Sequence, residues 1–102
     1  MNETWIKIVG YEGFYEVSDL GNVRSLTDKG RYGRFNRLRL LKPALLRDGY
    51  LRITMCVDGN KQQMTVHRLV LSSFDKDEPS LFVNHINGIK TDNRLVNLEW
   101  CT

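Results

Sequence analysis

The stretch MTVHRLVLSSFDKDEPSLFVNHINGIKTDNRLVNLEWCT, residues 64–102, determines the fold of the chain. A short apolar run, LFVN, leads into His85, and a second run, NLEW, begins at Asn97. The polar segment INGIKTDNR between them contains a glycine and several Asn and Asp residues, which favour turns. This order predicts a strand, a tight loop and a second strand, preceded by a helix that opens at residues 65–68.

The apolar residues of this stretch give the loop a core to pack on. Because a loop on such a scaffold holds its polar groups in fixed positions, we expect His85 at the edge of the core. The ordinary pKa of histidine lies near neutrality, so this edge is a candidate site for proton transfer. The apolar residues are Leu81, Val83, Leu95, Leu98 and Trp100.

The segments VHRLV, NHINGIKTDN and NRLVNLEW, taken together, resemble the HNH motif of phage and intron homing endonucleases. The resemblance covers about residues 64–102, and several spaced elements make it far more specific than a single His-Asn pair. It implies a metal-dependent DNA endonuclease whose core is a ββα-metal finger.

The resemblance also implies a role for each polar residue of the finger. His85 would be the general base that activates water, and Asn84 would bind a single divalent cation, Mg²⁺ or Mn²⁺. Asn93 or Asn97 would hold the loop by hydrogen bonds to backbone. Phosphodiester cleavage needs a deprotonated water and a cation on the phosphate, so these residue types suit the reaction. Asn84 offers an oxygen without charge, and we expect weaker metal binding than aspartate would give.

In the HNH family a helix after the finger supplies a further metal ligand, an Asn or His several residues beyond the tryptophan. This sequence ends at Thr102, two residues after Trp100. The expectation is therefore a ββα-metal finger truncated at its C-terminus, and completion by another chain or by a second copy is an open alternative.

Length and composition indicate one small domain, or two very small modules that share a core, in a protein that stays in the cell that makes it. The chain has 102 residues, 41% of them hydrophobic, and no apolar run that could span a membrane. The polar segment NETWIK after Met1 does not resemble a secretion signal. We expect Cys56 and Cys101 to be buried free thiols, because neither has metal-site spacing. The resemblance to phage proteins implies action in the cytoplasm of a bacterial host.

Positive charge is concentrated between residues 29 and 47. This segment carries seven cations and no acid, whereas the remainder of the chain is net negative. The concentration favours contact with DNA phosphates over a merely solvated loop. The cations, with five arginines suited to forked contacts, are Lys29, Arg31, Arg34, Arg37, Arg39, Lys42 and Arg47.

The N-terminal segment WIKIVGYEGFYEVSDLGNVRSL has the pattern of a small antiparallel unit. Residues 14–17 and 23–26 form alternating runs around the turn formers of residues 19–22. The segment closely resembles the NUMOD4 motif found at the N-terminus of phage HNH homing endonucleases. For its aromatic residues, core packing is favoured over stacking on DNA bases.

Residues 50–66 contain the clearest hairpin signal, a pair of strands around Asp58-Gly59. We expect this hairpin to join the basic segment to the finger in a continuous sheet. In the helix that follows, Leu69, Val70 and Phe74 are the expected buried side.

Two residues at the start of this helix have alternative interpretations. His67 is interpreted as a structural hydrogen bonder in preference to a metal or phosphate contact. Arg68 is a candidate phosphate contact.

The predicted architecture is α+β. It comprises a NUMOD4-like β module (residues 1–26), a basic DNA-binding segment with a hairpin (27–63) and the HNH-like finger (64–102). Two functions remain open: a metal-dependent endonuclease acting on double-stranded DNA, and a DNA-binding remnant or subunit that lacks cleavage. A protein-interaction domain is the weakest alternative. Loss of nicking in His85→Ala would distinguish the first two, and salt-sensitive DNA binding would distinguish both from the third.

Overall fold

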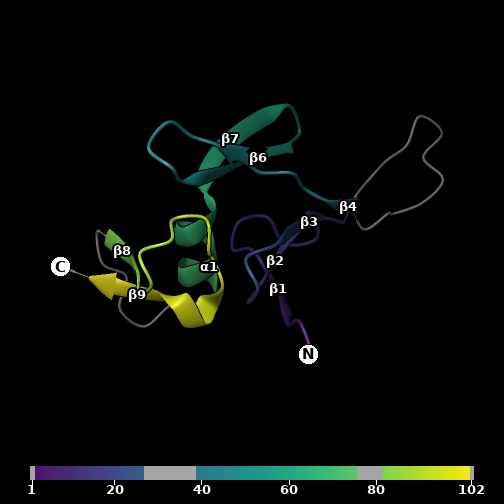
Figure 1. Ribbon diagram of the computed structural model, residues 1–102. Helices are drawn as coiled ribbons and strands as arrows, with labels where there is room; N and C mark the ends of the chain where they lie inside the picture. Colours follow the sequence, from purple (N-terminus) through teal and green to yellow (C-terminus); the bar gives the residue numbers. More distant parts are fainter. Residues whose placement is uncertain (1, 27–38, 76–81, 102) are drawn as a thin grey trace.

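The computed structural model describes residues 2–26, 39–75 and 82–101. These residues form three small antiparallel sheets arranged around one α-helix, as Figure 1 shows. The observed architecture confirms the predicted α+β class.

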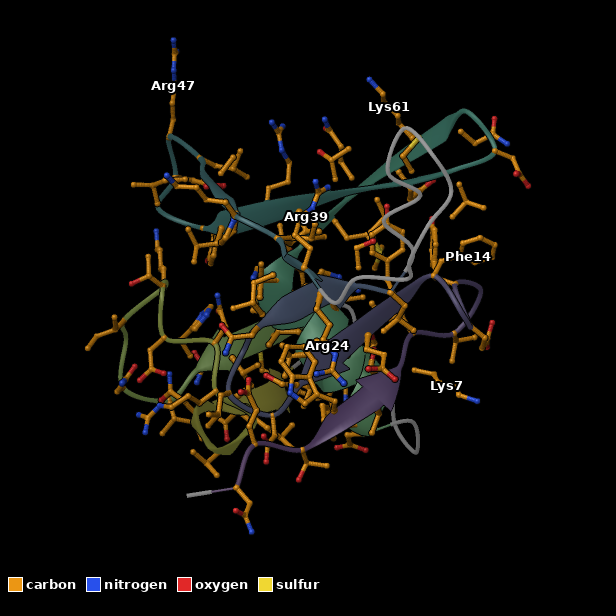
Figure 2. All side chains as sticks on the ribbon, turned by 90° about the vertical axis from the view of Figure 1, so that its right-hand side faces the viewer. Lys7, Phe14, Arg24, Arg39, Arg47 and Lys61 are labelled. Carbon is orange, nitrogen blue, oxygen red and sulfur yellow. The ribbon has the colours of Figure 1, made fainter. Side chains whose placement is uncertain are left out.

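The first sheet contains β1 (Trp5–Lys7), β2 (Tyr15–Ser18), β3 (Val23–Ser25) and β4 (Arg39–Leu40), in that order. Along β2 and β3, alternate residues are buried, as expected for strands with one face on a core. The predicted strand, turn and strand at residues 14–26 are therefore confirmed. Tyr15 is buried, and Phe14 points away from the core with 38% of its surface exposed (Figure 2).

The second sheet contains β5 (Ala44–Leu45), β6 (Leu51–Val57) and β7 (Asn60–Thr65). Asp58 and Gly59 connect β6 to β7 with φ angles of 52° and 82°. Positive φ at both positions is typical of the primed two-residue turns that suit hairpin twist. The hairpin predicted from the Asp-Gly pair is confirmed.

Helix α1 (Val66–Phe74) follows β7 directly, and its buried side includes Leu69 and Val70, as predicted, while Phe74 is only partly buried. The chain then forms β8 (Phe82–His85), a 3₁₀ turn η1 (Leu95–Asn97) and β9 (Leu98–Cys101). Strands β8 and β9 pair so that Asn84 lies opposite Glu99, and His85 lies opposite Leu98.

The prediction of one continuous sheet from the basic segment to the finger is wrong. Strand β4 pairs in the first sheet, β5 pairs in the second, and β8 with β9 forms a third. Two local features explain the interruptions. Pro43, which lacks an N–H group, lies between β4 and β5, and β7 runs directly into α1.

Helix α1 joins the three sheets into one core. It contacts strands of all three, and Figure 1 shows it between the finger and the N-terminal sheet. The least exposed side chains come from β2, β3, β6 and α1, so neither half of the chain has a separate core. They are Val17, Val23, Ile53, Met55, Val66, Leu69 and Val70.

Within the described residues neither cysteine forms a disulfide, which agrees with the predicted thiols, but the prediction that they are buried is wrong, because Cys56 is exposed and Cys101 is half-buried. Ile53 and Met55 point inward from β6, so Cys56 follows the strand alternation to the exposed face. Within the described residues, no helix is long and apolar enough to cross a membrane.

Candidate active site

His85 is held at the end of β8 with its ring orientation determined by Asn93. The side chain is 7% exposed, and Nε2 lies 2.8 Å from Oδ1 of Asn93. Because an amide oxygen only accepts hydrogen bonds, Nε2 carries the proton and donates it. In the neutral ring, Nδ1 therefore keeps a lone pair that can accept a proton.

Two further rings pack against His85. Tyr50 stacks on His67 with centroids 4.7 Å apart, and the His67 and Tyr50 centroids lie 5.0 and 5.8 Å from that of His85. The stack unites the residue before β6, the first turn of α1 and the end of β8. Sequence reasoning did not identify Tyr50 as part of the site, since a strand-flanking aromatic gives no local sign of a partner 35 residues away.

His67 is buried without a hydrogen-bond partner at Nδ1 within the described residues. The structure shows ring stacking at His67, and at Nδ1 it gives no support for the interpretation of this residue as a hydrogen bonder. Burial, and then the nearby His85 and Arg68, lower the pKa of His67 to about 4, against a smaller opposing effect of Asp48. At neutral pH His67 is consequently an uncharged ring beside His85.

Asn97 holds the loop between β8 and β9. Its Oδ1 accepts the backbone N–H of Asn87 at 3.0 Å, and its Nδ2 donates to the Asn87 side chain and to the backbone oxygen of Asp92. These contacts are the kind that the predicted loop-holding role requires. Asp92 also pairs with Arg94, whose hydrogen bonds hold the pKa of that carboxyl well below its usual range.

Asn84 lies on the exposed face of the finger, on the side of β8 opposite to His85. Its Nδ2 donates to Oε1 of Glu99 at 2.8 Å. Within residues 2–26, 39–75 and 82–101, no group of three or more His, Cys, Asp or Glu side chains could hold a metal ion. The donors on this face of β8 are thus an amide oxygen and a carboxylate, next to His85 in sequence and on the other side of the strand, and they suit a cation that prefers oxygen and retains water ligands.

Glu99 was not identified from the sequence. Its place opposite Asn84 depends on the pairing register of β8 with β9. A hairpin alignment starting from His85 opposite Leu98 would have found it.

A turn from the N-terminal half closes over the ring stack. The Lys90 ammonium donates to the backbone oxygen of Asp48 at 2.7 Å and lies 4.9 Å from the Tyr50 ring centroid. Gly49 in this turn has a φ of +93°, and a Cβ there would lie 3.0 Å from Cδ of Lys90. Lys90 thereby ties the finger loop to the turn that carries Tyr50.

The described part of the basic segment lies on the surface. Arg39, Lys42 and Arg47 are exposed, and none forms an ion pair with another described residue. Figure 2 shows Arg47 extending away from the ribbon at the turn between β5 and β6. Arg68 is exposed on α1, next to His67. The remaining predicted DNA contacts, Lys29, Arg31, Arg34 and Arg37, lie outside the described residues.

Comparison with known families divides the chain into two matched regions. Residues 3–56 match the NUMOD4 motif, and residues 65–102 match the HNH endonuclease family. The two regions together include every residue of the site described above.

Similar proteins occur in viruses. The chain is 37% identical over 99 residues to DNA endonuclease I-HmuI of Bacillus phage SP01, covering 96% of this chain and 52% of the phage protein. It is 38% identical over 107 residues to an uncharacterized HNH endonuclease of Acanthamoeba polyphaga mimivirus, covering 99% of this chain and 24% of the viral protein. The chain thus spans about half the length of the phage relative and about a quarter of the length of the mimivirus relative.

A solved structure has the same fold. The structure titled "DNA binding and cleavage by the HNH homing endonuclease I-HmuI" superposes with a TM-score of 0.81 at 38% sequence identity. The match covers 97% of this chain and 52% of that one.

Proposed function

Since this chain belongs to the family of HNH endonucleases with an N-terminal NUMOD4 motif, we propose that it hydrolyses phosphodiester bonds in double-stranded DNA. His85 is the general base in this proposal. The DNA-binding residues are the seven cations of residues 29–47, together with Arg68. The three regions 1–26, 27–63 and 64–102 serve as NUMOD4 module, basic segment and nuclease finger. By analogy with its phage relative, we place its action in the cytoplasm of a bacterial host.

One observation carries this proposal: the hydrogen bond between His85 Nε2 and Asn93 Oδ1. It assigns the ring proton to Nε2 and leaves Nδ1 as the basic nitrogen. A water molecule at Nδ1 can then give its proton to that nitrogen as its oxygen bonds to phosphorus, while one ester P–O bond breaks and the departing sugar oxygen takes a proton from solvent. The packed rings of Tyr50 and His67 reduce the freedom of His85 to rotate away from this orientation.

HNH endonucleases are generally metal-dependent, and Mg²⁺ or Mn²⁺ is the ion we propose here. When bound, such an ion stabilises negative charge on the phosphate. The Asn84 side-chain oxygen, with Glu99 opposite it, would hold the ion. Glu99 supplies the negative charge that Asn84 lacks.

A plasmid-nicking assay tests the proposed function. Purified chain and supercoiled plasmid are incubated with Mg²⁺ or Mn²⁺, and a matched reaction contains excess EDTA. The expected result is conversion to open-circular or linear DNA that requires the added cation. No conversion with either cation would contradict the proposed hydrolysis.

Duplex DNA binding, measured in parallel, distinguishes the endonuclease from the alternative function, a DNA-binding subunit without cleavage. With six or more phosphate contacts, raising salt from about 50 to about 200 mM should weaken duplex binding by about 10³-fold or more. Salt-sensitive binding without nicking would support a DNA-binding subunit that requires a completing chain or a second copy. Absence of both would contradict a role on DNA.

Asn84→Asp tests the metal role of Asn84. The substitution places a second carboxylate opposite Glu99, so we expect tighter Mn²⁺ binding and faster nicking at limiting metal. Isothermal titration of Mn²⁺ measures the affinity without reference to cleavage. The control is Asn60→Asp, which adds the same charge at an exposed position of β7. Equal Mn²⁺ affinity in the two variants would remove Asn84 from the proposed metal site.

A further inference from the structure

The turn between β2 and β3 lies in direct contact with the segment that carries Asn93. A Cβ built on Gly21 would lie 2.8 Å from the Asn93 backbone oxygen and 3.0 Å from its carbonyl carbon and its Cβ. The backbone N–H of Leu95, two residues later, donates to the backbone oxygen of Asp19 at 2.8 Å. A turn of the NUMOD4 region therefore packs backbone against backbone on the nuclease finger.

The conformation of this turn is determined within the N-terminal sheet. Ser18 is fully buried, and its Oγ accepts the backbone N–H groups of Leu20 and Asn22. Thr4 exchanges hydrogen bonds with Asp19, one through the side chain and one through the backbone. Contacts within the N-terminal sheet therefore hold the turn in its conformation independently of its contact with the finger.

Asn93 is the residue through which this contact reaches the candidate active site. It is 4% exposed, and its Oδ1 accepts the proton of His85 Nε2. Its backbone has no room to move toward the turn, because only the absence of a side chain at Gly21 permits the present separation. The position of Asn93 determines in turn where the ring of His85 is held.

We propose that the β2–β3 turn, through Gly21, is a positioning element for the nuclease site: it sets the backbone of Asn93, which in turn orients the general base. The NUMOD4 region then supplies part of the scaffold of the active centre in addition to any contact with DNA. The predicted effect on catalysis rests on the proposed function. The predicted effect on the position of Asn93 rests on backbone geometry alone.

Gly21→Ala tests the proposal against a closely matched control. Gly10 and Gly21 both have a φ of +88°, so alanine meets the same backbone strain at either position. Nothing lies within 4 Å of a Cβ at Gly10, whereas at Gly21 it meets Asn93. We expect Gly21→Ala to lower kcat for nicking by about 10- to 100-fold with KM nearly unchanged, because small displacements of a catalytic group have effects of this size. Gly10→Ala should retain wild-type kinetics.

A measurement on His85 itself distinguishes failure of this inference from failure of the proposed function. Nitrogen-15 NMR of the histidine rings reports which nitrogen of His85 carries the proton, without DNA or cleavage. We expect wild type and Gly10→Ala to show the Nε2–H tautomer, and Gly21→Ala to show a mixture or a shifted Nε2 resonance.

Ser18→Ala provides a second variant that loosens the turn without a steric clash, and it decides the outcome if Gly21→Ala does not fold. Its His85 resonances should shift in the same direction and by a smaller amount. Wild-type His85 resonances in the folded variants, with kinetics equal to those of Gly10→Ala, would overturn the proposal.

Discussion

Replacing His85 with alanine is expected to lower the rate of plasmid nicking by about 10²–10⁴-fold, the usual contribution of a general base. The loss should be this large because no neighbouring described group can substitute. His67 is the nearest titratable ring, and its Nδ1 is sealed from solvent without a partner. Asn93 is only a hydrogen-bond partner and does not accept protons near neutral pH.

The loss must be separated from structural damage, because His85 is buried against two other rings and its removal leaves a cavity. Adding imidazole to the His85→Ala reaction supplies the missing base in that space, and nicking should recover in part. Duplex binding and its dependence on salt should remain as in wild type, since the basic segment is unaltered. Nicking at the wild-type rate in His85→Ala would exclude His85 as the base.

The second large effect is a loss of folding stability in acid that arises at His67. The pKa of His67 is about 4 in the folded protein and 6.5 in its reference state. Between these values the unfolded chain binds more protons, so the free energy of unfolding increases with pH across this window. The stability that the folded protein gains from keeping His67 uncharged is therefore fully present above pH 6.5, and it is lost as the pH falls toward 4. At 1.36 kcal/mol for each pKa unit, it amounts to about 3 kcal/mol.

His67→Phe isolates this effect. The substitution retains an aromatic ring against Tyr50 and removes both the titration and the unpartnered Nδ1. Urea unfolding at several pH values between 4 and 7 should show the pH-dependent loss reduced by about 3 kcal/mol relative to wild type. At neutral pH the variant should be at least as stable as wild type, because a buried unpaired nitrogen has been removed. An unchanged pH dependence would show that His67 is not the responsible group.

Features with a local chemical cause could be predicted from the sequence. The Asp58-Gly59 pair fixes a hairpin because both residues tolerate positive φ. Helix α1 and the strands around His85 follow from apolar spacing, and the family resemblance identified His85 and Asn84 within a segment whose fold the structure bears out. In each case the signal lies within a few residues of the feature.

Features that depend on contacts between distant segments could not be predicted. Tyr50 reaches His85 only because the turn after β5 folds over the finger, and Gly21 meets Asn93 only because two sheets pack on α1. The division into three sheets combines a local cause with a distant one. Pro43 and the start of α1 interrupt the strands, and the packing of the pieces around the helix determines which sheet each one joins.

The bond from Lys90 to Asp48 bears on how such proteins could recombine. The two matched regions resemble exchangeable cassettes in sequence, with a boundary between residues 56 and 65. Lys90 belongs to one cassette, whereas Asp48, Gly49 and Tyr50 belong to the other. A chimera that joins this finger to a foreign N-terminal half would keep the HNH sequence motif. It would lose the contacts of Lys90 with Asp48 and Tyr50. Successful exchange therefore requires the finger loop and the turn after β5 to be transferred together.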